Sequence, residues 1–326
     1  MKVLVTGGAG YIGSQTAKAL AQAGHEPIAL DNLSTGHRWA AQWGPLIEGD
    51  LADAELVNRI FSEHRISAVM HFAANALVGE SVSNPQKYYW NNVVNTLKLL
   101  DAMKATQARY IVFSSSAATY GNPEQALITE DHPQRPVNPY GETKLAMERA
   151  LHWYGGAYGL KWIALRYFNA AGADVEGKLG EDHDPESHLI PSIIQAMLGA
   201  RPAVEIFGTD YPTPDGTAVR DFIHVADLAE AHLRALEHLT AGGESGGFNL
   251  GTGAGHSVRE VITATEKLSG KPIPSVCSPR RAGDPPVLVA DAARAQRVLK
   301  WRARYSDLET IIRSALNWHE SRGHKK

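Results

Sequence analysis

The chain has 326 residues, of which 44% are hydrophobic and 21% charged, and this composition fits a globular protein with one large α/β domain or two lobes. Its 32 basic and 35 acidic residues give a net charge of −3 without a long run of one sign, so we expect no nucleic-acid or membrane partner. No apolar run reaches the ~18 residues that a membrane span needs, and Met1–Thr6 leave no room for a signal peptide. Cys277 is the only cysteine, so the sequence cannot form an internal disulfide. We therefore expect a cytoplasmic protein.

The first half alternates short runs of β-branched or aromatic residues with longer amphipathic stretches. The predicted strands cover residues 2–6, 26–31, 45–48, 68–72, 110–114 and 162–167. The predicted helices cover residues 11–23, 54–64, 86–105 and 140–158. Such alternation is typical of a parallel sheet with helices on both faces. We therefore expect a doubly wound, Rossmann-like α/β domain over residues 1–168.

The pattern changes after residue 168, where a polar, glycine-containing stretch runs to about residue 187. Two turn-rich segments follow at 208–216 and 242–247. Helical patterns cover residues 225–239, 258–268, 292–299 and 308–320. These features predict a smaller α+β substrate-binding lobe over residues 169–326, from which about 217–241 rejoin the first domain.

A glycine-rich turn follows the first predicted strand and begins the first predicted helix. Gly7, Gly10 and Gly13 are spaced three residues apart there, with Tyr11 and Ile12 between the last two. Glycines let the backbone approach a pyrophosphate, which the positive end of the helix then stabilises. The position between a strand and a helix indicates a dinucleotide-binding turn.

A carboxylate at the end of the second predicted strand favours NAD over NADP. Asp31 lies eighteen residues after Gly13, about where a carboxylate accepts hydrogen bonds from the ribose hydroxyls of adenosine. The same carboxylate would repel a 2′-phosphate. Further cofactor contacts are expected after the third and fourth strands, from Asp50, Leu51, Phe72, Ala73 and Ala74.

Tyr140 and Lys144 are one helical turn apart and therefore lie on the same face of a helix. A nearby cation lowers the pKa of a tyrosine hydroxyl, which is about 10 when unperturbed, so the pair fits an acid/base catalyst. The hydroxyls of Ser114–Ser116 end a buried strand at the carboxyl edge of the sheet, where ligands of such folds bind. Ser116, Tyr140 and Lys144 at that edge predict a proton relay for oxidising an alcohol over a nicotinamide.

With these motifs the chain resembles the extended short-chain dehydrogenase/reductase family and, within it, the UDP-glucose (UDP-galactose) 4-epimerases. The motifs follow in order over nearly the whole chain: Thr6–Gly13, Asp31–Leu33, His71–Ala74, Val78–Ser81, Ser114–Ser116, Tyr140–Lys144, Arg166–Asn169, His188–Pro191, Asp215–Thr217, Val219–Val225 and Arg281–Asp284. The resemblance implies NAD as the cofactor and a UDP-sugar as the substrate. It also implies a homodimer formed through the helices over 86–105 and 140–158.

The resemblance assigns the remaining site residues. Ser116 is implied as the serine of the triad, because it lies four residues before Tyr120. Further cofactor contacts are implied for Asn32, Ser34, Asn91, Ser114, Phe168, and the catalytic Tyr140 and Lys144. Substrate contacts are implied for Ser116, Tyr140, Asn169, His188, Leu189, Glu205, Ile206, Phe207, Arg220, Arg281 and Asp284.

A nucleotide-sugar diphosphate needs fixed cations. Arg220 and Arg281 are the expected ligands, because a guanidinium group pairs well with phosphate oxygens. Asp284 is expected to accept from a ribose or uracil donor. The backbone of residues 205–207 is expected to face the uracil ring.

The implied reaction interconverts UDP-galactose and UDP-glucose. NAD-dependent oxidation at C4 is followed by rotation of the 4-keto sugar and re-reduction on its opposite face. Ala117 and Ala118 stand where sugar-nucleotide dehydratases of this family use an acidic pair, so elimination is disfavoured. Two alternatives stay open: epimerisation of another UDP-sugar (a UDP-N-acetylhexosamine, a UDP-pentose or a UDP-uronate), and net NAD-dependent oxidation or reduction of a sugar nucleotide.

Two histidines in the polar stretch after residue 168 raise the question of a metal. His183 and His188, with Asp182 and Asp184, are compatible with a metal site or with a polar loop that covers the pocket. We favour the loop, because the sequence shows no further ligand cluster beside them. We therefore expect no metal.

Overall fold

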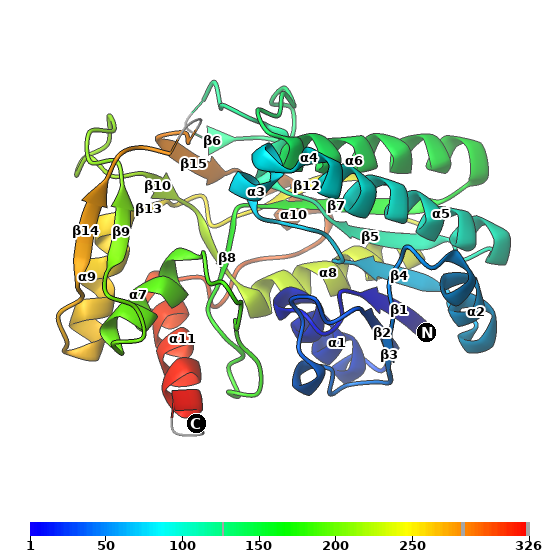
Figure 1. Cartoon of the computed structure of the whole chain (residues 1–326). Helices are drawn as coiled ribbons and strands as arrows, with labels where there is room; N and C mark the ends of the chain where they lie inside the picture. Colours follow the sequence, from blue (N-terminus) through cyan, green and yellow to red (C-terminus); the bar gives the residue numbers. More distant parts are fainter. Residues whose placement is uncertain (126, 282–283, 324–326) are drawn as a thin grey trace.

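The computed structural model describes residues 1–125, 127–281 and 284–323, so Ala282 and Gly283 of the Arg281–Asp284 motif lie outside the described residues. A seven-stranded parallel sheet forms its centre, with the strand order β12-β7-β5-β4-β1-β2-β3 (Figure 1). The strands are β1 (Lys2–Thr6), β2 (Glu26–Asp31), β3 (Leu46–Glu48), β4 (Ala68–His71), β5 (Tyr110–Ser114), β7 (Lys161–Tyr167) and β12 (Gly246–Leu250). The predicted doubly wound α/β sheet is confirmed.

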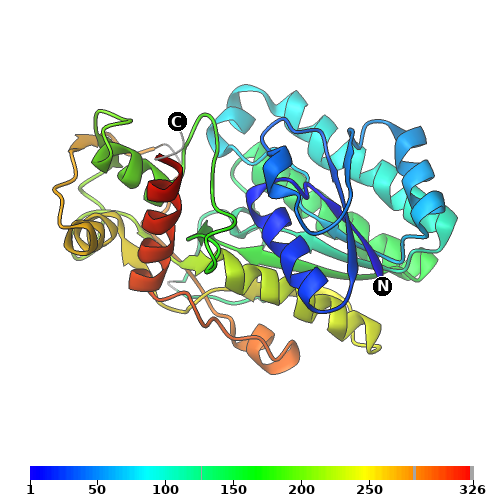
Figure 2. The same cartoon turned by 90° about the horizontal axis from the view of Figure 1, so that it is seen from below.

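Helices cover both faces of this sheet. One face packs against α1 (Tyr11–Gln22) and α8 (Val225–Thr240), which lie side by side in Figure 2. The other face packs against α2 (Ala54–His64), α5 (Asn95–Thr106) and α6 (Pro139–Tyr158).

Side chains of each strand alternate between the two resulting cores. Val3 and Val5 enter the core beneath α1 and α8, whereas Leu4 enters the core beneath α2 and α5. This alternation follows from the pleat of a strand. Because both faces are buried, each strand reads in the sequence as a nearly continuous apolar run.

The smaller lobe is built from short strands and three helices. Its four-stranded sheet has the order β13-β10-β15-β6 (His256–Ser257, Val219–Arg220, Val287–Ala290 and Leu127–Ile128). Two strand pairs accompany it: β8 with β11 (Asn169–Ala171 and Phe222–His224) and β9 with β14 (Val204–Phe207 and Ser275–Ser278). A third apolar core joins α7, α9 and α11 (Leu189–Met197, Val258–Ser269 and Leu308–Gly323).

Several elements differ from the predicted ones. β12 lies partly in a segment predicted as turn-rich, and it is a strand because residues 246–250 pair along β7, so tertiary pairing overrides local propensity. The predicted helix over 86–105 divides into α4 (Pro85–Tyr88), a π-helical segment (Tyr89–Val94) and α5.

Short elements complete the chain: α3 (Val78–Ser83), α10 (Ala293–Val298) and the 3₁₀ turns Arg38–Ala40 and Ala117–Thr119. β8 and α7 lie where no regular element was predicted. Among the described residues, no helix is both long enough and apolar enough to span a membrane.

The glycine turn predicts a matched pair of stability effects. A Cβ at Gly13 would lie 2.1 Å from the Gly7 carbonyl oxygen, whereas a Cβ at Gly156 in α6 meets nothing within 4 Å. We expect Gly13→Ala to lower the free energy of unfolding by about 1–3 kcal/mol, because the turn must shift. Gly156→Ala is expected to raise it by about 0.5–1 kcal/mol through helix propensity. Urea unfolding measures both; equal effects of the two substitutions would contradict the close packing at Gly13.

Candidate active site

The predicted cofactor residues gather at one edge of the central sheet. All seven strands run parallel, so their carboxyl ends share that edge. Gly7 follows β1 with φ of 71°, a left-handed conformation that favours glycine. A Cβ at Gly7 would lie 2.8 Å from the backbone nitrogen of Ala73, just beyond β4. The turn therefore requires glycine where β1 and β4 end beside each other.

The beginning of α1 is open to an anion. Gly10 is its N-cap, and no side chain caps the first turn. The first N–H groups of a helix have no partner within the helix, and a Cβ at Gly10 would meet only the Gly7 carbonyl oxygen, at 3.3 Å. Backbone donors and free space thus coincide, which fits the pyrophosphate of a dinucleotide.

Asp31 is held at the end of β2 beside this turn. Its Oδ2 accepts a hydrogen bond from the Ala9 backbone nitrogen at 2.9 Å, and its Oδ1 accepts from that of Leu33 at 2.9 Å. Asn32 donates from Nδ2 to Asp50 Oδ2 at 2.6 Å, which links the ends of β2 and β3. The carboxylate is therefore fixed where the sequence places an adenosine ribose.

The other predicted cofactor residues lie along the same edge. Phe72 and Ala73 donate their backbone N–H groups to the Thr6 carbonyl oxygen. The remaining ones follow the strands or lie on the first helices: Tyr11, Ile12, Ser34, Leu51, Ala74, Asn91, Ser114 and Phe168. Asn91 is in the π-helical segment and donates to its neighbour Asn92, whose side chain bonds both backbone groups of Asn75.

Lys144 is buried beneath the edge of the sheet. Its Nζ donates to the Ser114 carbonyl oxygen at 2.7 Å and lies 4.9 Å from the centre of the Phe113 ring. Burial lowers the pKa of Lys144 to about 7, against the opposing effect of Glu148. An ammonium of lowered pKa is able to exchange a proton near neutrality.

Tyr140 lies one turn before Lys144, and its ring centre is 5.8 Å from Lys144 Nζ. Burial raises the pKa of the phenol, and the hydroxyl of Ser116 only partly offsets the rise. The lowering expected from Lys144 is therefore not found in the chain by itself, where burial is the main influence on the pKa of the phenol. Ser116 follows β5 and accepts from the Ala118 backbone nitrogen at 3.1 Å.

A buried ion pair that the sequence did not indicate lies behind this set. Glu148 on α6 accepts from Arg166 on β7, with an Nη2–Oε2 distance of 2.6 Å and side-chain exposures of 5% and 9%. Ser115 also donates to Glu148, and Arg166 donates to the Tyr120 hydroxyl at 2.8 Å. Glu148 lies four residues after Lys144, so helical spacing alone would have indicated a shared face.

The predicted diphosphate ligands lie in the smaller lobe. Arg220 on β10 pairs with Asp284. The Asp284 carboxylate, which was expected to accept from a ribose or uracil donor, therefore already accepts from a guanidinium group. The Arg281 guanidinium lies 3.9 Å from the centre of the Phe207 ring. Arg220 would therefore reach a diphosphate only by sharing its charge with Asp284.

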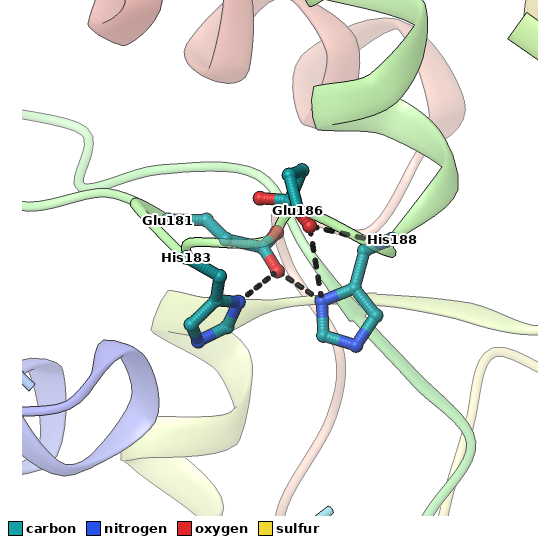
Figure 3. A group of neighbouring side chains, drawn as sticks. All are labelled: Glu181, His183, Glu186 and His188. Atoms are coloured by element: carbon teal, nitrogen blue, oxygen red, sulfur yellow. Dashed lines mark hydrogen bonds and ion pairs between the residues drawn. The ribbon is translucent and has the colours of Figure 1, made fainter. Parts of the chain in front are cut away.

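The remaining substrate candidates lie on other elements of the smaller lobe. β9 carries Glu205, Ile206 and Phe207 at the edge of a two-stranded sheet; Glu205 is exposed and Ile206 is buried. Asn169 begins β8, and its backbone nitrogen donates to the Asp221 carbonyl oxygen. His188 is the N-cap of α7, followed by Leu189, and its Nδ1 pairs with the buried Glu181 (Figure 3).

Comparison with known proteins agrees with this geometry. Residues 3–251 match the model of the NAD dependent epimerase/dehydratase family. The chain belongs to this family. A UDP-glucose 4-epimerase of Halalkalibacterium halodurans is 53% identical over 324 residues, which are 99% of this chain and 97% of that protein.

Solved epimerase structures share the whole fold. A UDP-glucose 4-epimerase from Brucella ovis, in complex with NAD, has a TM-score of 0.95 and 52% identity over 97% of both chains. One from Stenotrophomonas maltophila, with bound NAD and formylated UDP-arabinopyranose, has a TM-score of 0.96 and 40% identity over all of both chains. The resemblance drawn from the motifs is confirmed.

The buried ion pair predicts a large loss of stability that a surface pair does not share. Glu148→Gln leaves the Arg166 charge buried without its partner, so we expect the free energy of unfolding to fall by about 3–5 kcal/mol. Glu124→Gln removes the exposed pair with Arg135, whose side chains are 60% and 76% exposed, and is expected to cost no more than about 1 kcal/mol. Denaturant unfolding of both variants is the measurement. Equal losses would show that the Glu148–Arg166 pair does not stabilise the site.

Proposed function

We propose that this protein interconverts UDP-galactose and UDP-glucose as an NAD-dependent 4-epimerase. The observation that carries the proposal is the position of Tyr140 and Lys144 on α6, at the sheet edge that also holds the glycine turn. The family model and the relatives that are about half identical support the same activity.

NAD fits the edge of the sheet that the first domain provides. The open start of α1 would hold its pyrophosphate, and Asp31 would accept from its adenosine ribose, which favours NAD over NADP. Bound there, NAD would supply the acceptor for the hydride that leaves C4 of the sugar and, once reduced, the donor of the hydride that returns to the opposite face. The side chain of Lys144 would hold the nicotinamide ribose.

The chain's own residues accept and return the proton of the C4 hydroxyl. Tyr140 Oη takes the proton of the C4 hydroxyl, and Ser116 Oγ donates a hydrogen bond to the same substrate oxygen. Burial disfavours the phenolate in the chain alone, so a positive charge brought by the cofactor would add to that of Lys144. Tyr140 returns the proton once the sugar has turned. Ala117 and Ala118 supply neither acid nor base, so elimination of water has no catalyst there.

The smaller lobe would hold the nucleotide and leave the hexose free to rotate. Arg220 and Arg281 would bind the diphosphate, and the edge of β9 would face the uracil. Asn169, His188 and Leu189 would line the sugar-nucleotide pocket. The sugar can present both faces of C4 only if the UDP part is bound firmly and the sugar loosely.

Three further assignments belong to the proposal. Residues 1–168 without β6, together with α8 and β12, form the NAD-binding domain, and the rest of 169–326 with β6 forms the UDP-sugar-binding lobe. The part that rejoins the first domain, expected over about 217–241, is therefore α8 followed by β12, because β10 and β11 pair within the smaller lobe. A homodimer forms through the segments 86–105 and 140–158; Trp90 and Trp153, 59% and 72% exposed on these segments, support it. A cytoplasmic location agrees with the exposed free thiol of Cys277. A role in galactose metabolism follows from the proposed substrates.

Two alternative substrates or reactions remain. A different UDP-sugar is supported by the Stenotrophomonas maltophila relative, whose structure holds formylated UDP-arabinopyranose. Net oxidation or reduction of a sugar nucleotide would use the same triad. Incubation with UDP-galactose and a trace of NAD distinguishes the three: an epimerase forms UDP-glucose without accumulating NADH. Absence of UDP-glucose at adequate protein concentration rejects the proposed substrate, and accumulation of NADH with turnover identifies net oxidation.

The phenol of Tyr140 is expected to be essential to the rate. Tyr140→Phe should fold and bind NAD but lose at least about 100-fold in turnover, because general acid–base catalysis contributes that much or more. Tyr154→Phe is the matched control: it lies on the same helix and loses only a hydrogen bond to Asp101. Steady-state kinetics of both variants test the role, and near-normal turnover in Tyr140→Phe would remove Tyr140 from it.

A further inference from the structure

Four potential metal ligands converge in the loop between β8 and α7. We call Glu181, His183, Glu186 and His188 the histidine–glutamate cluster (Figure 3). One donor atom from each residue lies within 4.8 Å of the others. The sequence suggested Asp182 and Asp184 as partners of the histidines, whereas the structure supplies two glutamates.

The donors are close enough together for small movements of the side chains to form a metal site. Bonds of about 2.0–2.2 Å in a tetrahedral zinc site put neighbouring donors roughly 3.4 Å apart. His183 Nδ1 lies 3.1 Å from Glu181 Oε1, and His188 Nδ1 lies 3.9 Å from Glu186 Oε1. Shifts of about an ångström would therefore complete the coordination shell.

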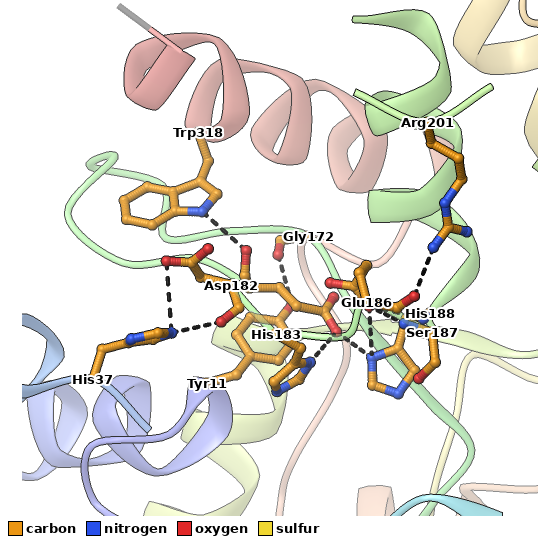
Figure 4. A network of polar contacts seen from close by, with 11 residues as sticks. Tyr11, His37, Gly172, Asp182, His183, Glu186, Ser187, His188, Arg201 and Trp318 are labelled. Atoms are coloured by element: carbon orange, nitrogen blue, oxygen red, sulfur yellow. Dashed lines mark hydrogen bonds and ion pairs between the residues drawn. The ribbon is translucent and has the colours of Figure 1, made fainter. Parts of the chain in front are cut away.

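Contacts from other elements hold the cluster (Figure 4). Trp318 on α11 donates its indole N–H to the Glu181 carbonyl oxygen at 3.2 Å, and Arg201 donates to the Glu186 carbonyl oxygen at 2.8 Å. The Glu186 carboxylate accepts from the backbone nitrogens of Ser187 and His188, both at 2.8 Å. Contacts of this kind orient metal ligands. Each of them involves a backbone group, so none of them depends on a bond between two side chains of the cluster.

Asp182 is directed away from the cluster. Its carboxylate lies 3.0 Å from Arg322 and 3.6 Å from His37 Nε2, and Figure 4 shows it beside His37. The aspartate–histidine combination, which the sequence made conceivable but did not favour, is therefore not formed at Asp182. The glutamates of the cluster are instead 3% and 8% exposed, whereas the side chains of His183 and His188 are 28% and 49% exposed.

We propose that the histidine–glutamate cluster binds one divalent transition-metal ion, with Zn²⁺ as the best match. Two imidazole nitrogens and two carboxylate oxygens suit Zn²⁺, whereas Mg²⁺ and Ca²⁺ prefer oxygen ligands alone. The cluster shares His188 with the proposed sugar-nucleotide pocket, but binding of the ion is measured without substrate, so its outcome does not depend on the proposed epimerase activity.

Zinc binding by the full-length, NAD-containing protein tests the site. The background is Cys277→Ser, because the exposed thiol of Cys277 would itself bind zinc. After treatment with a chelator, calorimetric titration with Zn²⁺ should give one ion per chain. Titration with Co²⁺ should give the intense visible absorption of a four-coordinate ion, and Mg²⁺ should give no binding in the same range.

Variants connect the bound ion to the cluster. His183→Ala and Glu181→Gln should each weaken the binding of Zn²⁺ about 100-fold or more, since even second-layer changes cost 10–100-fold. His152→Ala, which removes an exposed histidine on α6, should leave it unchanged. Zn²⁺ should also raise the unfolding temperature of the background protein but not that of a folded His183→Ala variant. Absence of binding, or binding unchanged in both cluster variants, overturns the proposal.

Discussion

The buried ion pair between Glu148 and Arg166 fixes the helix that carries Tyr140 and Lys144 against the sheet. Three guanidinium–carboxylate hydrogen bonds of 2.6–3.2 Å join α6 to β7, and Ser115 joins the same carboxylate to the end of β5. Removing either charge would leave the other buried and unpaired, which is strongly unfavourable. The ion pair thereby fixes the position of α6 along the sheet, and so the position of Tyr140 relative to the sheet edge.

The same pair also acts on the neighbouring cation. Lys144 is buried, and its ammonium is satisfied by the Ser114 carbonyl oxygen and favoured by the negative charge of Glu148. Without that charge, burial alone would lower the pKa of Lys144 further. A single carboxylate therefore connects the stability of the first domain with the electrostatics of the proposed proton relay.

The two lobes contribute different kinds of structure to the proposed site. The cofactor edge consists of strand ends and one helix start, fixed by backbone hydrogen bonds such as those to Asp31. The substrate side consists of short strands and side-chain pairs, such as Arg220 with Asp284. A reaction at both faces of one carbon requires that the cofactor and the UDP part be held in fixed positions while the sugar is free to rotate.

Local patterns made much of the fold and the chemistry predictable. The glycine turn, Asp31 and the Tyr140–Lys144 spacing are short-range signals with a direct physical meaning, and the bounds of β1, β2, α2 and β5 agree with those predicted. β12 was not predictable, because Gly246 and Gly247 form a strand only through pairing with β7.

Long-range side-chain contacts were likewise absent from the patterns. Arg166 meets Glu148, and Arg220 meets Asp284, across large separations in the sequence. The raised pKa of Tyr140 was missed for a related reason: burial, its main cause, is a property of the packed site.

The fate of the hydrogen on C4 tests the central claim most directly. UDP-galactose carrying deuterium at C4 is converted in ordinary water, and the UDP-glucose formed is examined by mass spectrometry and NMR. Transfer to NAD and back within one site predicts that the deuterium remains at C4 of the product. Replacement of the deuterium by a hydrogen from water would contradict the account, because it would mean that C4 loses a proton and not a hydride.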